Sequence, residues 1–222
     1  MGDIPYTVRR SPRARRVRVN VHTPAGARCA EVEVVLPQRA PARAAAAAVQ
    51  ELRPWIERRL AEAHAALAQV ARRGGTVPYL GRSLELVAQD GRRRAHLRGD
   101  RLLVPSGDPR PALELFYRRA ARSEIAARLD RATALAGTSY SGLSIRGQRT
   151  RWASCSAAGR MSFNWRLLLA PESVLDYVVW HEVCHLEVLD HSPRFWELVQ
   201  RRWPRWREDR DWLRRHGATL VL

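Results

Sequence analysis

The segment His181-Glu182-Val183-Cys184-His185 carries the residue types of a hydrolytic metal site. Positions i and i+4 of a helix lie on one face, so His181 and His185 can present their imidazoles to one ion. Glu182 lies about 100° further round the helix axis, within reach of a water molecule at the ion without being a ligand itself. With 7 histidines in 222 residues, only about 0.01 matches to this pattern are expected by chance. The spacing predicts a catalytic metal site with Glu182 as its general base.

Apolar residues flank this motif on both sides. The run 174–180 precedes it, and Leu186, Val188 and Leu189 follow, so we expect a buried helix that opens at Pro171-Glu172. Buried histidine pairs and a buried glutamate are costly unless they are paired or bound to a metal. The apolar context therefore favours the metal site over two ordinary helix histidines.

The third ligand is expected to be His191. In a continued helix it would lie about 9 Å along the axis from His185, so the helix has to stop and the chain has to turn. Ser192 is a typical N-cap and Pro193 a typical first helical residue, which predicts a new helix over 193–202. Glu187 is the competing ligand, but in a helix it would point away from the histidine face. Three protein ligands with a fourth position open to water are typical of catalytic zinc.

Composition limits the remaining possibilities. A hydrophobic content of 45% in 222 residues indicates a globular chain, and no run of 18 apolar residues predicts a membrane span. The N-terminus lacks an apolar signal segment, and the three cysteines form no disulfide framework. We therefore expect a cytoplasmic protein with no membrane partner, and the sequence predicts no particular oligomeric state.

The net charge of +17 raises the question of nucleic acid as a partner. Six arginines fall between Arg9 and Arg18, and a second cluster extends from Arg92 to Arg101. However, the chain contains no lysine, which favours a compositional bias toward arginine, because phosphate grooves normally use both residues. A nucleic-acid partner is possible but is not favoured over a peptide or protein substrate.

Periodicity predicts a mixed N-terminal region. Alternating valines over 17–21 and 32–34, separated by the turn Thr23-Pro24-Ala25-Gly26, predict a β-hairpin. Residues 41–73 favour helix with a break near Arg53, because Pro54 interrupts the run. Gly74-Gly75 ends this helix, and three short strands are expected over 83–88, 93–97 and 101–104, linked by turns at Asp90-Gly91 and Gly99-Asp100.

A boundary is expected after Asp108, which gives an N-terminal β-rich and helical region (1–108) and a catalytic domain (109–222). The catalytic domain is expected to begin with a long helix over 111–136 and to continue with strands over 143–149 and 160–165. Two helices, over 193–202 and 204–216, are expected to close it. The overall fold class predicted is α+β.

The C-terminal half resembles the YgjP-like metal-dependent hydrolases, a zincin group similar to the SprT-like and WLM metallopeptidases. The stretches that carry the resemblance are 151–156, 163–167, 177–186 and 191–196, with weaker ones at 9–16, 55–56 and 78–81. Ala153 stands where the family usually has glycine. The resemblance implies a zincin-like metallopeptidase domain and one Zn²⁺ per chain.

The mechanism expected is hydrolysis of peptide bonds, with Zn²⁺ held by His181, His185 and His191. The strand over 160–165 is a candidate for binding an extended peptide along an exposed edge. Competing interpretations are a nucleic-acid-associated protease, a non-proteolytic metal hydrolase and a metal-binding scaffold without catalysis.

Candidates for oxyanion stabilisation are Arg151, Tyr140 and Tyr177, each with a structural role as the alternative. Two cysteines also lie in this half, and we interpret both as structural: Cys184 as a small buried side chain and Cys155 as neither ligand nor regulator.

Overall fold

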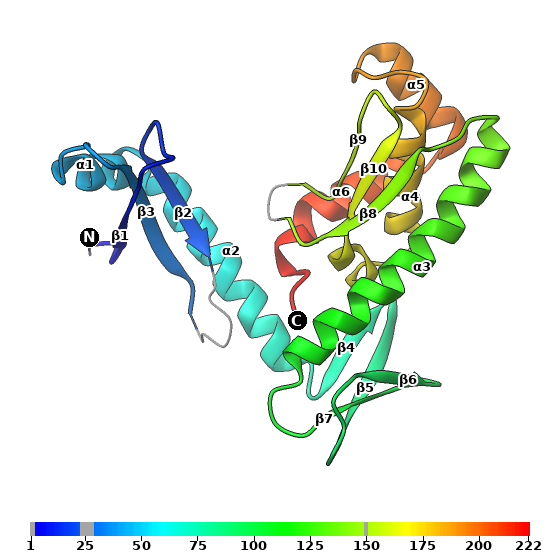
Figure 1. The fold of residues 1–222 in the computed structure, drawn as a ribbon, viewed down its shortest axis with the longest axis horizontal. Coiled ribbons are helices and arrows are strands. Elements are labelled where there is room, and N and C mark those ends of the chain that lie inside the picture. The colour runs from blue at the N-terminus through cyan, green and yellow to red at the C-terminus, as the bar shows by residue number, and fades with distance from the viewer. Residues whose placement is uncertain (1–2, 23–28, 149–150) are drawn as a thin grey trace. The chain divides into compact units, whose positions relative to one another are not determined.

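The computed structural model describes residues 3–22, 29–148 and 151–222, and the chain forms two compact units, residues 1–72 and 73–222. Both units combine helices with small sheets (Figure 1), which confirms the expected α+β class. Among the described helices, none has the length and apolar character that a bilayer crossing requires.

The first unit is a three-stranded sheet with two helices. Strand order is β1-β3-β2, and β2 pairs antiparallel with β3, which confirms the expected hairpin. Its expected turn, 23–26, lies outside the described residues. The parallel pairing of β1 with β3 was not expected. The elements are β1 (Thr7–Ser11), β2 (Arg18–His22), β3 (Glu31–Pro37), α1 (Arg43–Glu51) and α2 (Arg53–Arg72).

This unit has its own hydrophobic core. Alternate residues of β3 point to the same face, and that face packs against α1 and the start of α2. The break between the two helices falls at Leu52, two residues before Pro54, as the sequence predicted. The buried members of this core are Val32, Val34, Leu36, Ala45, Val49 and Ile56.

The second unit opens with a four-stranded sheet of order β4-β5-β7-β6. The turn at Gly99, with a φ of 60°, joins β6 to its antiparallel partner β7, as expected. The turn at Gly91 makes no hairpin, because β5 pairs with β7 in parallel instead. Strand β4 was not predicted. The strands are β4 (Thr76–Tyr79), β5 (Arg82–Gln89), β6 (His96–Arg98) and β7 (Arg101–Pro105).

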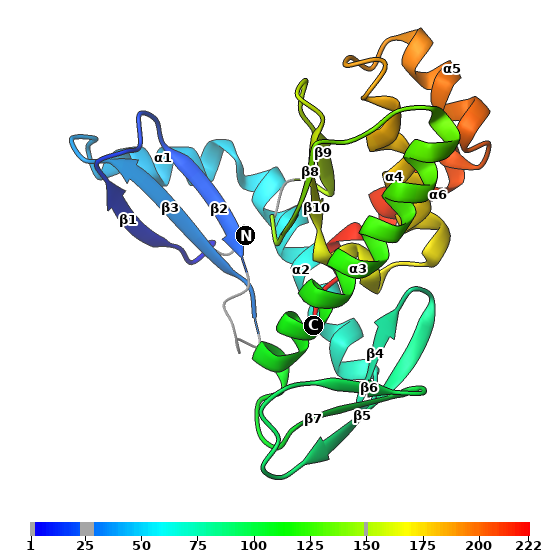
Figure 2. The same cartoon turned by 45° about the vertical axis from the view of Figure 1, so that its right-hand side comes forward.

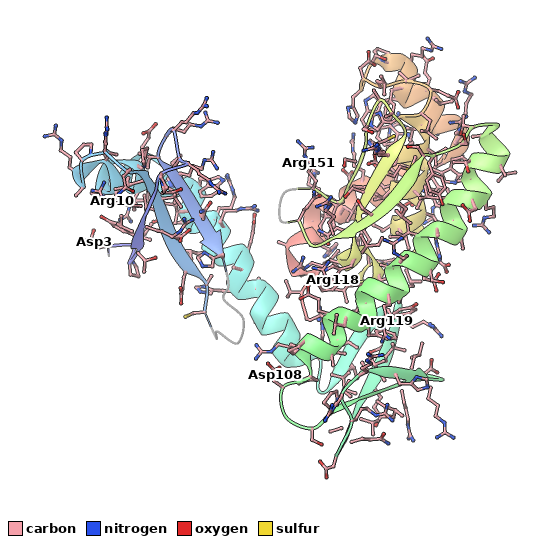
Figure 3. The ribbon with its side chains drawn as sticks, viewed as in Figure 1. Asp3, Arg10, Asp108, Arg118, Arg119 and Arg151 are labelled. Carbon is pink, nitrogen blue, oxygen red and sulfur yellow. The ribbon has the colours of Figure 1, made fainter. Side chains whose placement is uncertain are left out.

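This sheet shares its core with the long helix α3 (Arg110–Ala136). The Tyr117 hydroxyl donates a hydrogen bond to the Pro78 carbonyl at 2.5 Å, and Leu113 is buried among the side chains of the sheet. The division between units therefore falls at residues 72–73, whereas the boundary expected after Asp108 lies on the loop between β7 and α3 (Figure 3). That residues 109–222 alone form the catalytic domain stays a prediction.

The rest of the second unit builds a small mixed sheet and a set of helices beside it. In the sheet, β10 lies between β8, its parallel neighbour, and β9, its antiparallel neighbour. Helices α3 and α4 both contact this sheet and lie on the same side of it in Figure 2. The elements are β8 (Gly142–Arg146), β9 (Ala153–Cys155), β10 (Arg160–Asn164), η1 (Trp165–Leu169), α4 (Glu172–Cys184), α5 (Pro193–Arg202), α6 (Trp206–His216) and η2 (Gly217–Thr219).

Candidate active site

Helix α4 carries the first two histidines at its C-terminal end. It is buried on most sides, and it stops at Cys184, so that His185 is the residue that caps it. The chain then turns: the Asp190 carboxylate accepts a hydrogen bond from the Ser192 backbone N–H at 3.0 Å, and α5 starts at Pro193. This corner brings His191 back toward the end of α4, as the sequence required of a third ligand.

The three histidines lie together. His181 Nε2 and His191 Nε2 are 3.1 Å apart, and one ligand atom from each of His181, His185 and His191 lies within 4.8 Å of the others. His185 Nδ1 lies 3.0 Å from the Val188 carbonyl oxygen, so this nitrogen carries the proton and Nε2 keeps its lone pair. The backbone of the turn thus orients one imidazole for ligation.

The distance between two of the three histidines is close to that of a tetrahedral metal site. With metal–nitrogen bonds of about 2.0–2.1 Å, the ligand nitrogens of a tetrahedron lie about 3.3 Å apart, close to the 3.1 Å between His181 and His191. Burial, and then the neighbouring imidazoles, lowers the pKa of His181 to about 3. Burial also lowers the pKa of His185. Both imidazoles are therefore neutral at physiological pH, the form that binds a metal.

Aromatic side chains of α5 hold the imidazoles in place. The fully buried Phe195 ring stacks on His185 at a centroid distance of 4.4 Å and contacts His181 at 4.9 Å. Trp196 lies 5.8 Å from His181 and 5.7 Å from His191. Because these rings occupy the space behind the imidazoles, the cluster has little room to rearrange.

Glu182 faces the same site from the last turn of α4. It is only 4% exposed, and its Oε2 atom has no hydrogen-bond partner among the described residues. Burial raises the pKa of its carboxyl to about 8, although a hydrogen bond from the Cys155 backbone N–H opposes the rise. An unpartnered buried oxygen beside a histidine cluster is expected where a water or substrate group binds.

A cavity of about 600 Å³ opens over these residues. Its walls come from the segment at β9, from α4 and the turn that follows it, and from one face of α6. The residues that line it are Arg151, Trp152, Ala153, Ser154, Cys155, Tyr177, Val178, His181, Glu182, His185, Leu189, His191, Arg210, Leu213 and Arg214.

Comparison with known proteins places this arrangement in a family. The model of the YgjP-like family, described as a metallopeptidase domain, matches residues 16–216. The chain belongs to the YgjP-like metallopeptidases. It is therefore a metal-dependent hydrolase with a zincin-like domain, as the motifs indicated.

Other comparisons add little to the family match. The crystal structure of the metallopeptidase zymogen of Pyrococcus abyssi abylysin is 25% identical, with a TM-score of 0.38 over 42% of this chain and 92% of that chain. No curated protein matches the chain.

The cavity of this YgjP-like metallopeptidase is lined by β9, one of the two edge strands of its sheet, which corrects one expectation. The strand over 160–165 was a candidate for binding a peptide along an exposed edge, but β10 lies between two other strands. Ala153 to Cys155 form the edge and line the cavity. Only three residues pair here, too few to show an alternating pattern, so no strand was predicted at β9. Ala153 is in extended backbone opposite Phe163, a conformation that alanine adopts without strain.

Two other residues considered for the site, one as a metal ligand and one for oxyanion stabilisation, have partners outside it. Glu187 forms an ion pair with Arg202 and does not join the histidine group. The Tyr140 hydroxyl donates to Asp130 at 2.9 Å, and Tyr140 does not line the cavity. Glu187 is therefore no longer a competing ligand, and Tyr140 is not positioned to stabilise an oxyanion.

The remaining candidates divide between the cavity and the core. Tyr177 and Arg151 line the cavity. Cys155 lines it too, but its sulfur is not in the metal-ligand group, and burial raises the pKa of its thiol to about 11. Cys184 is fully buried. Both thiols are therefore protonated, Cys184 is a packing residue as expected, and that Cys155 is not a regulator stays a prediction.

The contribution of α6 to the metallopeptidase site was not predicted from the sequence. Arg210, Leu213 and Arg214 line the cavity, at the i, i+3, i+4 spacing of one helix face. The spacing was visible in the sequence. Which face of the helix meets the site depends on packing between distant segments, which local patterns do not contain.

Proposed function

We propose that this metallopeptidase is a zinc-dependent peptidase in which His181, His185 and His191 hold one Zn²⁺ and Glu182 is the general base. The observation that carries the proposal is the three-histidine group with an unpartnered, buried Glu182 oxygen beside it in one cavity. When bound, zinc polarises the scissile carbonyl and lowers the pKa of the attacking water. Peptides or proteins are the substrates that follow, and nucleic acid is not favoured.

Glu182 has the properties of a proton carrier at neutral pH. A general base works best when its pKa lies near the working pH, and burial has moved that of Glu182 in this direction. In the proposed reaction Glu182 accepts the proton of the attacking water and passes it to the leaving amine. His185, fixed by the Val188 carbonyl, and His181, fixed by Phe195, keep the ligand nitrogens in place meanwhile.

Substrate binding is proposed along β9. An edge strand presents backbone N–H and C=O groups that can pair with an extended peptide, and β9 runs along the cavity wall. A peptide bound there would pass in front of Glu182, to which the Cys155 backbone already donates. Tyr177 and Arg151, in the same lining, are the remaining candidates for stabilising the oxyanion.

The test compares zinc-loaded wild type with Glu182→Gln on a mixture of peptides, with cleavage followed by mass spectrometry. We expect cleavage by the wild type and a fall in kcat/KM of about 10²–10⁴-fold in the variant, the range of general acid–base catalysis. Zinc content should stay near one per chain in both proteins, because Glu182 is not a ligand. Undiminished turnover by the variant would remove Glu182 from its role. A zinc-loaded wild type that cleaves no peptide would instead favour a metal-binding scaffold without catalytic activity.

A further inference from the structure

Three arginines from two separate segments line the cavity that holds the proposed zinc site. Arg210 and Arg214 project from the cavity face of α6, with Leu213 between them. Arg151, labelled in Figure 3 in the segment that leads into β9, is the third arginine of the lining. All three side chains belong to exposed residues, so they can meet a substrate as it enters. We call them the arginine rim.

The charges of the rim are largely uncompensated. Within the part of the chain that the structure describes, neither Arg151 nor Arg210 forms an ion pair. Arg210 instead lies over the Trp206 ring at 4.7 Å and the Trp196 ring at 5.7 Å, which fixes its direction. Arg214 meets Asp211 only at 3.7 Å and keeps 79% of its side chain exposed, so solvent screens that pair strongly.

None of the three acidic residues of α6 lines the cavity, although Asp211 is the partner of Arg214. Glu208 pairs with Arg205. Asp209 is buried and accepts hydrogen bonds from Ser173 at 2.9 Å and from the Trp203 indole at 2.7 Å. Among the lining residues, Glu182 is the one carboxylate. A concave site lined by one sign of charge concentrates ligands of the opposite sign.

We propose that the arginine rim makes this enzyme select peptides that carry an aspartate or glutamate side chain beside the scissile bond. The proposal rests on the proposed peptidase function and adds its substrate class. Arg210 is close to the reacting centre: it contacts Trp196, whose ring lies 5.7 Å from His191. Its charge also reaches the Tyr177 hydroxyl, whose pKa burial raises to about 12 against the opposing effect of Arg210.

The rest of the lining favours a peptide over a nucleic acid as the anionic ligand. Trp152, Val178, Leu189 and Leu213 give the cavity apolar walls, and Leu189 is 62% exposed. Such walls suit the apolar side chains of a peptide with an acidic residue among them. A nucleic acid would need a basic surface that follows a repeating phosphate backbone, whereas the rim is confined to one cavity.

The first test uses zinc-loaded wild type and peptides of one length with both termini blocked. Each position around a cleaved bond is occupied in turn by Glu, Gln or Lys. We expect kcat/KM to be about fivefold or more higher for Glu than for Gln at one of these positions, and lower still for Lys. The preference should fade at about 1 M salt, where the Debye length is about 3 Å.

Variants of the arginine rim then show which arginines cause the preference for Glu over Gln peptides. Arg210→Gln and Arg214→Gln should each reduce the ratio of Glu to Gln peptides, mainly through KM. Arg214→Glu should improve cleavage of the Lys peptide relative to wild type, a gain that misfolding cannot produce. Arg215→Gln is the matched control, because it removes the same charge from the next residue of α6, which does not line the cavity.

Three outcomes would overturn the proposal. Cleavage of Glu, Gln and Lys peptides at equal rates would remove acidic selection while leaving the peptidase function intact. Cleavage of the same peptides only after their C-terminus is left unblocked would assign the rim to the terminal carboxylate. Inhibition by a single-stranded oligonucleotide with a steep salt dependence, together with no preference among peptides, would assign it to nucleic acid. If no peptide at all is cleaved, the proposed function itself fails.

Discussion

At the scale of single residues, the site depends on ionisable groups whose charged forms are disfavoured by burial. Burial lowers the pKa of His181 to about 3 and raises that of Glu182 to about 8. The His181 imidazole is therefore neutral and can bind a metal without losing a proton. The Glu182 carboxyl can keep a proton at neutral pH. A base with a lowered pKa next to an acid with a raised pKa, both in one cavity, is typical of catalytic sites.

The Glu182 carboxyl should make the stability of the metal-free protein depend on pH. Burial raises its pKa from an ordinary 4.5 to about 8, so between these values the unfolded chain releases a proton that the folded chain keeps. The contribution of Glu182 to the free energy of unfolding should therefore fall as pH rises from about 4.5 to about 8, by a few kcal/mol at about 1.36 kcal/mol per pKa unit. The lowered pKa of His181 acts in the opposite direction up to about pH 6.5, so the difference between wild type and Glu182→Gln is the quantity to measure. Glu182→Gln should flatten this fall, as measured by denaturant unfolding of the chelated proteins. Parallel curves for both proteins would show that the carboxyl is not buried.

Gly217 should be sensitive to the addition of a single methyl group. Its backbone is helical, with a φ of −56°, but a Cβ atom there would lie 2.8 Å from the Trp152 ring. Gly217→Ala should lower the free energy of unfolding by about 1–3 kcal/mol and reduce kcat/KM, because Trp152 lines the cavity. Gly142→Ala is the control: nothing lies within 4 Å of its added Cβ, so its stability should not fall. Equal stabilities for the two variants would contradict this packing.

The sequence predicted the histidines but not the arginine rim, and the reason is distance along the chain. His181, His185 and His191 lie within eleven residues, and helix geometry plus the Ser192-Pro193 start signal determine how they meet. Arg151 and Arg210 are nearly sixty residues apart and come together only through packing of α6. In a chain with 39 basic residues, no local feature separates these arginines from the others.

At the scale of elements, α4 is held to α3 by one arginine. Arg128 of α3 lies 2.8 Å from Asp176 and 2.5 Å from Glu172, both on α4, and 2.5 Å from Glu124 on its own helix. Its side chain is 11% exposed and that of Asp176 is 18% exposed. Burial raises the pKa of Asp176, and the charge of Arg128 opposes the rise. The ion pairs thus keep the helix that carries the motif in a fixed position.

Removal of Arg128 should leave a half-buried carboxylate unpaired. Arg128→Met should lower the free energy of unfolding by about 3 kcal/mol at pH 7, because breaking one side of a buried pair leaves the other charge unsatisfied. Adding Asp176→Asn should restore part of the loss, and a double-mutant cycle measures the coupling. Arg122→Met, at an exposed position of the same helix, should change stability little. Strictly additive effects of the two substitutions would argue against the pair.

Long elements followed from the sequence, whereas several short ones did not. Pro193 and the apolar spacing after it defined α5 correctly, and Pro54 placed the break between α1 and α2. The missed strands, β1, β4 and β9, have three to five residues, too few for a period to appear. The pairing of β5 with β7 was missed because a turn shows where the chain reverses, not which strand becomes its neighbour.

At the scale of the whole molecule, metal binding and folding should be coupled in the second unit. The three histidines come from α4, its C-terminal cap and the turn before α5, so an ion that binds them favours the folded arrangement over the unfolded chain. A ligand present at about 1,000 times its Kd stabilises the folded state by about 4 kcal/mol.

Removal of the metal should therefore lower the thermal stability. For a unit of this size, a loss of about 4 kcal/mol corresponds to a fall in Tm of about 10 °C on treatment with a chelator, and added zinc should restore it. Differential scanning calorimetry with and without zinc measures the change. In His191→Ala the Tm should respond much less to zinc. A wild-type Tm that is the same with chelator and with zinc would separate the histidine cluster from metal binding.

The most direct measurement is the zinc content of the purified protein by elemental analysis, in wild type, His191→Ala and Glu187→Gln. We predict about one zinc per chain in wild type, a large loss in His191→Ala, and an unchanged content in Glu187→Gln, since that carboxylate is paired with Arg202. Zinc retained in full by His191→Ala, or no zinc in wild type after reconstitution, would contradict a three-histidine site.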